Sequence, residues 1–185
     1  MKRILFINPS LRLNSHTKYL PIGIASVMSF LRSNGFEFEF FDVDIDDVVD
    51  HELESYLEDN RFDIILTGSI VTHYKWMKWL TRTVRKYNPN SFILVGNSVA
   101  GSVPELFLTN SDADIAIIGE GEITTSEVVT KICSGEDWYN TLGIAYKMRC
   151  GSIKVNQKRK ALKKLDEFPM VDWRDFDTDK YFKSL

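Results

Sequence analysis

Four short segments of this chain are rich in glycine and small polar residues, a composition suited to holding a ligand. Three of the four begin with glycine, which leaves the space of a side chain empty and lets backbone amides approach a ligand closely. We therefore expect them to line a binding crevice, and we predict no catalytic side chain among them. In chain order they are Asn8-Pro9-Ser10, Gly68-Ser69-Ile70-Val71-Thr72, Gly96-Asn97-Ser98-Val99 and Gly119-Glu120-Gly121-Glu122.

The last segment carries two carboxylates, Glu120 and Glu122, at the start of a predicted helix. Negative charge is favoured there by the helix dipole, so capping of the helix could account for one of them. Together, the two could instead accept hydrogen bonds from amide or hydroxyl groups of a neutral polar ligand. A bare phosphate would be repelled. The segment therefore favours a large, mostly neutral ligand.

Metal and redox chemistry have little support in the sequence. The three histidines, His16, His51 and His73, are not placed at metal-ligand spacing. Cys133 and Cys150 form no CxxC pair, and this cysteine usage suits a reducing cytoplasm, where we expect the protein to reside. His73 follows the third predicted strand at the beginning of a helix, where a neutral imidazole can ligate or donate a hydrogen bond. We keep it as a candidate ligand contact, with an ordinary surface histidine as the alternative.

Charged clusters are interpreted as solvated surface. The acidic segment from Asp42 to Glu54 lacks the glycine and the terminal glutamate of an EF-hand. The basic stretch Lys158-Arg159-Lys160 with Lys163-Lys164 lacks the interleaved aromatic residues of a nucleic-acid surface. A net charge of −3 and a pI of about 5.7 also argue against nucleic acid and anionic membranes as partners. No apolar stretch is long enough to insert through a bilayer.

The elements that must position the four segments alternate between strand and helix. Apolar runs predict strands at residues 3–7, 36–43, 62–67, 92–95 and 113–118, and helical spacing predicts helices at 23–33, 48–59, 74–87, 104–108 and 123–132. Strands joined by helical crossovers form a parallel sheet with right-handed connections. The sequence thus predicts an α/β fold: a doubly wound, five-stranded parallel sheet of the flavodoxin-like or Rossmann-like kind. The strand at 36–43 alternates apolar and polar residues, which places it near an edge in the order 2-1-3-4-5.

The 185 residues, 44% of them hydrophobic, suffice for one main domain with a small addition. We assign residues 1–136 to the α/β domain. Residues 137–157 contain two short apolar runs around Cys150-Gly151 and predict a β-hairpin appendage. Residues 158–185 have little that could form a core, and we interpret them as a linker toward a domain absent from this chain.

Two other functions of such folds are poorly matched. A phospho-acceptor receiver domain needs an acidic pair after the first strand, where this chain has Asn8-Pro9. A dinucleotide-binding domain needs GxGxxG there, but the first glycine is Gly23. A flavodoxin-like domain that binds a nucleotide or a nucleotide-sugar remains as an alternative.

Taken in order, six segments resemble the cobalamin-binding domain of radical S-adenosylmethionine enzymes. The tail Leu165-Asp166-Glu167-Phe168-Pro169 with Asp172-Trp173 also resembles the segment that joins this domain to the radical barrel. The resemblance spans nearly the whole chain and implies cobalamin (vitamin B12) as the cofactor. The six segments are Asn8-Pro9, Leu20-Pro21-Ile22-Gly23-Ile24, Gly68-Ser69-Ile70-Val71-Thr72, Gly96-Asn97-Ser98-Val99, Pro104-Glu105 and Gly119-Glu120-Gly121-Glu122.

The resemblance implies that the corrin lies over the carboxyl edge of the sheet. Its nucleotide tail would enter beside the third and fourth strands, near Gly68-Ser69 and Gly96-Asn97-Ser98. The DxHxxG loop of methionine-synthase-like domains is missing after the first strand, so cobalamin is expected to bind without that histidine. The family usually shows two glycines followed shortly by histidine after the fourth strand, whereas this chain has Gly96-Asn97-Ser98-Val99.

A CxxxCxxC cluster for a 4Fe-4S centre is also missing. The resemblance therefore implies a truncated amino-terminal domain, which alone would bind its cofactor without catalysis. The parent protein would be a cobalamin-dependent methyltransferase or cyclase-like enzyme. It would carry a radical barrel in cis, which would bind S-adenosylmethionine and a 4Fe-4S cluster.

Overall fold

A single seven-stranded sheet organises the computed structural model, which describes residues 2–10, 16–160 and 168–184. Its order is β2-β1-β3-β4-β5-β6-β7, and the first five strands are parallel. The predicted doubly wound fold and the order 2-1-3-4-5 are therefore confirmed. The strands are β1 (Ile4–Asn8), β2 (Glu39–Asp42), β3 (Ile64–Gly68), β4 (Phe92–Gly96), β5 (Ile115–Ile117), β6 (Ile144–Lys147) and β7 (Ile153–Val155).

The predicted hairpin is present as β6 and β7, but it continues the sheet instead of standing apart from it. Strand β6 pairs antiparallel with β5, with Ala145 opposite Ala116. Ile144, Ala145 and Tyr146 are all buried. Because both faces of β6 are apolar, the strand is stable only between two helical layers, and the open edge of β5 supplies that position.

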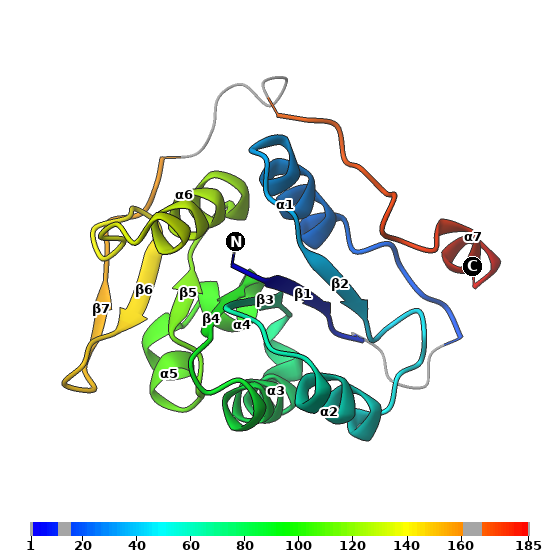
Figure 1. Cartoon of the computed structure of the whole chain (residues 1–185), viewed down its shortest axis with the longest axis horizontal. Coiled ribbons are helices and arrows are strands. Elements are labelled where there is room, and N and C mark those ends of the chain that lie inside the picture. Colours follow the sequence, from blue (N-terminus) through cyan, green and yellow to red (C-terminus); the bar gives the residue numbers. More distant parts are fainter. Residues whose placement is uncertain (1, 11–15, 161–167, 185) are drawn as a thin grey trace.

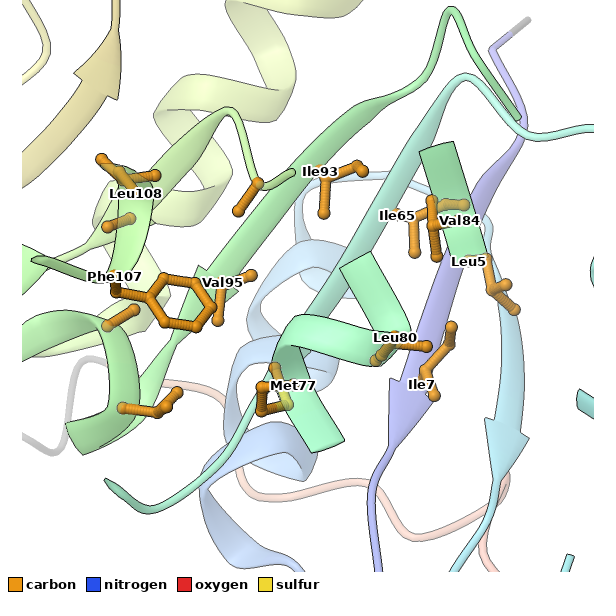
Figure 2. Packing of buried hydrophobic residues seen from close by; sticks show 14 of the residues in the cluster. Leu5, Ile7, Ile65, Met77, Leu80, Val84, Ile93, Val95, Phe107 and Leu108 are labelled. Carbon is orange, nitrogen blue, oxygen red and sulfur yellow. The ribbon is translucent and has the colours of Figure 1, made fainter. Parts of the chain in front are cut away.

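Helices cover both faces of the sheet (Figure 1). Helices α1 (Ile22–Ser33) and α6 (Gly121–Ser134) lie on one face, and α2 (Asp50–Asp59), α3 (Tyr74–Tyr87) and α5 (Pro104–Thr109) lie on the other. Figure 2 shows the apolar core of the second face, where Met77 and Leu80 of α3 pack over Ile7 and Val95 of the strands. A separate core lies beneath α1 and α6.

Two short elements follow β3 and β4 at the carboxyl edge of the sheet. They are the 3-10 turn η1 (Val71–His73) and helix α4 (Asn97–Gly101). Neither element is predicted from the sequence, because three to five residues are too few to show helical periodicity. Both begin within the segments that were predicted to line a ligand site.

Residues 168–184, which we call the C-terminal strap, pack along the domain. Figure 1 shows this segment passing α1 and ending in α7 (Thr178–Lys183) beside β2. The ring of Phe176 contacts that of Phe40 on β2 at a centroid distance of 4.5 Å. The Arg32 Nη2 atom on α1 lies 2.6 Å from the Asp175 Oδ2 atom. The strap therefore shares the core beneath α1.

The two charged clusters are only partly solvated. Asp42 and Asp44 are 8% and 7% exposed, so the solvated-surface interpretation is wrong for them, because neighbouring elements supply hydrogen-bond donors. Arg159 pairs with Glu127 of α6 and donates to Thr124 Oγ1 at 3.1 Å. Lys158 and Lys160 are exposed, as expected. Lys163 and Lys164 lie outside the described residues, as do Leu165, Asp166 and Glu167 of the predicted joining segment.

Candidate ligand-binding site

A cavity of about 360 Å³ lies at the carboxyl ends of β3 and β4, on the face covered by α1 and α6. This volume is in the range of small-molecule sites, and the carboxyl edge of the strands is where open α/β sheets bind their ligands. Its floor is apolar and its rim is polar. It is lined by Phe6, Gly23, Ile24, Val27, Leu66, Thr67, Gly68, Leu94, Gly96, Asn97, Ile117, Gly119, Glu120, Gly121, Glu122 and Thr125.

Glycines account for the hollow at the strand ends. Gly68 and Gly96 are directly paired, and a Cβ atom on Gly68 would lie 3.1 Å from the carbonyl carbon and oxygen of Gly96. A Cβ atom on Gly96 would meet nothing closer than Ile117 Cβ at 3.9 Å. A Cβ atom on Gly121 would lie 3.0 Å from Val27 Cγ2, so glycine there lets α6 approach α1. The glycines therefore leave the cavity open at the strand ends and allow α1 and α6 to pack together as its wall.

The structure brings part of the predicted site together around this cavity. The predicted residues that line it are Gly68, Gly96, Asn97, Gly119, Glu120, Gly121 and Glu122. The remaining predicted residues lie at the same edge of the sheet without lining it: Asn8, Pro9, Ser10, Ser69, Val71, Thr72, His73, Ser98 and Val99.

The loops after β3 and β4 are tied to each other. The Val99 amide donates to the Ser69 carbonyl oxygen at 3.0 Å, and the Val71 amide donates to Ser98 Oγ at 3.2 Å. Ser69 and Val99 are fully buried, whereas Val71 and Thr72 are exposed. Ser69, Ser98 and Val99 therefore shape the edge, and Val71 and Thr72 face outward from it.

Three buried polar atoms lack a hydrogen-bond partner in the described part of the chain near this edge. They are Thr67 Oγ1, Ser69 Oγ and His73 Nδ1. A buried polar group without a partner is costly, so such a group is expected where a ligand completes the hydrogen bonding. Among the three residues, Thr67 borders the cavity, but its side chain lies on the same face of the sheet as Ile7 and Val95, under α3. Thr67 is not among the residues predicted from the sequence, although its position directly before Gly68 at a strand end is a signal for this edge.

The loops after β1 and β2 form a buried polar cluster. Asn8 Nδ2 donates to Asp42 Oδ1 at 2.7 Å, and Ser10 Oγ donates to Asp44 Oδ1 at 2.6 Å. Burial raises the pKa of the Asp42 carboxyl, and hydrogen bonds from Asn8 and Tyr181 oppose part of that rise. The side chains of Asn8 and Ser10 are thus engaged within the protein, beside the cavity.

The two glutamates take different roles. Glu122 Oε1 accepts a hydrogen bond from Ser26 Oγ at 2.7 Å, which joins α6 to α1 at the rim of the cavity. Glu120 occupies the N-cap position of α6, where its side chain makes no capping hydrogen bond. Both carboxylates line the cavity and can accept hydrogen bonds from a ligand.

Asn97 explains the departure of the fourth-strand loop from the two-glycine pattern. Its φ angle is +63°, in the left-handed region that glycine adopts freely and asparagine tolerates best among other residues. Asn97 Oδ1 accepts a hydrogen bond from the Ser98 amide at 2.6 Å, which supports this conformation. Asparagine therefore preserves the backbone geometry of a glycine at this position.

Substitution of Asn97 tests this explanation. Asn97→Gly should change the free energy of unfolding by less than about 1 kcal/mol, because glycine accepts the same φ. Asn97→Val should cost about 1–2 kcal/mol, because a β-branched residue is strained there. Urea unfolding of both variants measures the difference, and equal stability of the two would contradict the explanation.

The described residues contain no group of three histidine, cysteine, aspartate or glutamate side chains that could hold a metal ion. In the same described ranges, no helix combines the length and apolar character needed to cross a membrane.

A family model described as the B12 binding domain matches residues 10–129 of this chain. An uncharacterised methyltransferase of Pyrococcus horikoshii, PH0819, is 24% identical over 87% of the chain and 35% of its own length. An uncharacterised protein of Methanocaldococcus jannaschii, MJ1620, is 29% identical over 83% of the chain and 28% of its own length. The chain therefore spans about a third of these relatives.

Two solved structures share the fold. The cobalamin-dependent S-adenosylmethionine radical enzyme OxsB, with aqua-cobalamin and S-adenosylmethionine bound, aligns with a TM-score of 0.83 and 20% identity. That alignment covers 100% of this chain and 25% of OxsB. The radical S-adenosylmethionine methyltransferase TsrM of Kitasatospora setae, with cobalamin and a 4Fe-4S cluster bound, has a TM-score of 0.73 at 16% identity. The alignment with TsrM covers 91% of this chain and 31% of TsrM.

Proposed function

Because this chain belongs to the B12-binding domain family, we propose that it binds cobalamin at the carboxyl edge of the sheet, with the nucleotide tail in the cavity between the sheet and helices α1 and α6. The observation that carries the proposal is the cavity itself. All of its lining residues except Phe6 fall within the segment that matches the family.

The residues of the cavity fit this cofactor in shape and in chemistry. Phe6, Leu66, Leu94 and Ile117 provide an apolar floor for a planar aromatic group. Glycines at the strand ends leave room for the tail to enter.

The rim fits the other end of the cofactor. A corrin carries amide side chains, which can donate hydrogen bonds to the carboxylates of Glu120 and Glu122. When bound, cobalamin supplies methyl-transfer or one-electron chemistry at its cobalt. The residues of this chain bind the cofactor, orient it and keep water from its tail.

The loop after β1 offers no DxHxxG histidine, and we include binding without that ligand in the proposal. In the reduced cobalt(II) state, an electron paramagnetic resonance spectrum without nitrogen splitting from a protein imidazole is the expected result. Splitting that disappears in His73→Ala would instead assign the ligand to His73, whose Nδ1 is buried without a partner.

The proposal extends to a parent enzyme with a radical barrel in cis, S-adenosylmethionine and a 4Fe-4S cluster. Its support is the likeness to OxsB and TsrM, together with relatives about three times as long as this chain. The parent reaction would be a methyl transfer or a cyclase-like radical reaction. Residues 158–185 would lead toward that barrel.

Uptake of hydroxocobalamin tests the central claim. Equilibrium dialysis of the 185-residue chain should show one bound cofactor, with a shift in its visible spectrum. No uptake at high micromolar cofactor would sink the proposal.

A nucleotide or nucleotide-sugar is the second candidate, favoured by the position of the cavity at the carboxyl edge of a parallel sheet. Ligands that bind the native state raise the melting temperature. A thermal-shift series should show stabilisation by cobalamins. Stabilisation by a nucleotide alone would favour the second candidate.

A further inference from the structure

Near its end, the C-terminal strap places the side chain of Tyr181 at the carboxyl edge of the sheet. Tyr181 on α7 is 1% exposed. Its hydroxyl donates to Asp42 Oδ2 at 2.7 Å, across 139 positions of the chain. Asn8 Nδ2 donates to Asp42 Oδ1 at 2.7 Å and approaches the Tyr181 hydroxyl oxygen at 3.3 Å. We call these three residues the Tyr181–Asp42–Asn8 triad.

The triad fixes the loops that leave β1 and β2. Asn8 and Asp42 are the last residues of these two paired strands. The Asp42 Oδ1 atom also accepts hydrogen bonds from the backbone amides of Asp44 and Ile45, at 3.2 and 3.3 Å. Asp44 in turn accepts a hydrogen bond from Ser10. One tyrosine of the strap therefore supports the carboxyl ends of two strands.

A neutral phenol is well suited to this position. Burial and the neighbouring Asp42 carboxyl raise the pKa of Tyr181 far above its ordinary value, so its hydroxyl remains a donor. A buried tyrosine hydroxyl needs such a partner. The acidic groups around it are Asp42 and Asp44, and Lys18 Nζ lies 3.3 Å from Asp44 Oδ1.

The strap also holds α1, one wall of the cavity. The Asp172 amide donates to Ser29 Oγ at 2.8 Å, and Arg32 pairs with Asp175. The Lys18 amide, shortly before α1, donates to Ser184 Oγ at 3.2 Å. Helix α1 contributes Gly23, Ile24 and Val27 to the cavity. The strap therefore touches both the edge and the wall of the site.

From this geometry we infer that Tyr181 is a positioning residue for the ligand site. Resting on the proposed function, the inference is that docking of the strap and binding of cobalamin stabilise each other through the triad and α1. Such coupling is reciprocal, because two events that favour one conformation must favour each other equally. Tyr181 touches no ligand itself and acts through Asp42 and Asn8.

Tyr181→Phe removes the hydroxyl and keeps the ring in its core. In equilibrium dialysis, the dissociation constant of hydroxocobalamin should rise about three- to tenfold, because tenfold is about the full worth of one buried hydrogen bond and Tyr181 acts on the ligand only through Asp42 and Asn8. Lys180→Ala is the matched control on the same helix. It removes an exposed ion pair with Asp46, and its dissociation constant should stay within about twofold of the wild type.

Hydrogen exchange of the strap supplies a second readout that does not depend on enzyme activity. Hydroxocobalamin should slow exchange of the amides in residues 168–184 of the wild type, and less so in Tyr181→Phe. Asp42→Asn keeps the volume of the side chain but leaves one acceptor oxygen, and it should act in the same direction. It replaces Tyr181→Phe as the test variant if Tyr181→Phe folds poorly.

The outcomes separate the two proposals. If the wild type takes up no hydroxocobalamin, the proposed function fails and the coupling fails with it. If the wild type binds and Tyr181→Phe has the same dissociation constant, the coupling alone is overturned. A lower melting temperature with unchanged affinity would likewise show that Tyr181 serves stability only.

Discussion

Gly96→Leu should weaken cobalamin binding by a factor of at least about one hundred while the domain stays folded. Gly96 has φ −114° and ψ −166°, an extended backbone that any residue adopts, so leucine introduces no strain there. A Cβ atom at this position would lie 3.9 Å from its nearest neighbour, Ile117 Cβ, which is an ordinary van der Waals contact. The leucine side chain would therefore occupy the cavity in place of the ligand.

The test compares dissociation constants for hydroxocobalamin and circular dichroism spectra. Gly96→Ala adds only one methyl group and should cost less than tenfold in affinity. Thr130→Leu, on the exposed surface of α6, adds a leucine away from the cavity and should leave binding unchanged. Tight binding by a folded Gly96→Leu variant would show that the cofactor lies elsewhere.

Phe6→Ala is expected to be the most destabilising substitution at the site, at about 3–5 kcal/mol. Phe6 is 1% exposed, and its ring meets that of Phe38 edge to face at a centroid distance of 4.9 Å. Removal of the ring deletes this contact and part of the floor of the cavity. Urea unfolding measures the loss, and Phe6→Leu should lose much less because most of the volume stays filled.

The same unfolding measurement can be repeated with the ligand present. Saturating hydroxocobalamin should return part of the lost stability, because binding to the native state adds to the free energy of unfolding. Phe107→Ala is the control, because Phe107 is fully buried in the core on the opposite face of the sheet. This substitution should lower the free energy of unfolding by a similar amount. If Phe6→Ala cost less than about 1 kcal/mol, the described packing of the floor would be wrong.

The fold could be predicted because its signals are local and repeated. Continuous apolar runs such as Ile64-Ile65-Leu66 mark strands buried on both faces, and the helical spacing between them requires crossovers. The position of the cavity follows from the same pattern, since parallel strands end at one edge. Glycine at the ends of β3 and β4 then predicts where the edge is hollow.

What escaped prediction depends on contacts between distant residues. Asp42 and Asp44 belong to an acidic run that looks solvated, and only the folded chain brings Tyr181, Asn8 and Lys18 to them. Hairpin signals define β6 and β7 but do not say which strand accepts the pair. Asn97 shows the reverse case, because the residue type departs from the family pattern while the conformation is kept.

The two borders of the sheet bear on how this protein behaves at high concentration. The border strands β2 and β7 contain only four and three residues. Each carries charge, with Glu39 of β2 paired to Arg3 and Lys154 of β7 exposed. Short, charged border strands are poor templates for intermolecular strand pairing. We therefore expect little aggregation through the borders of the sheet in the concentrated samples that ligand titrations require.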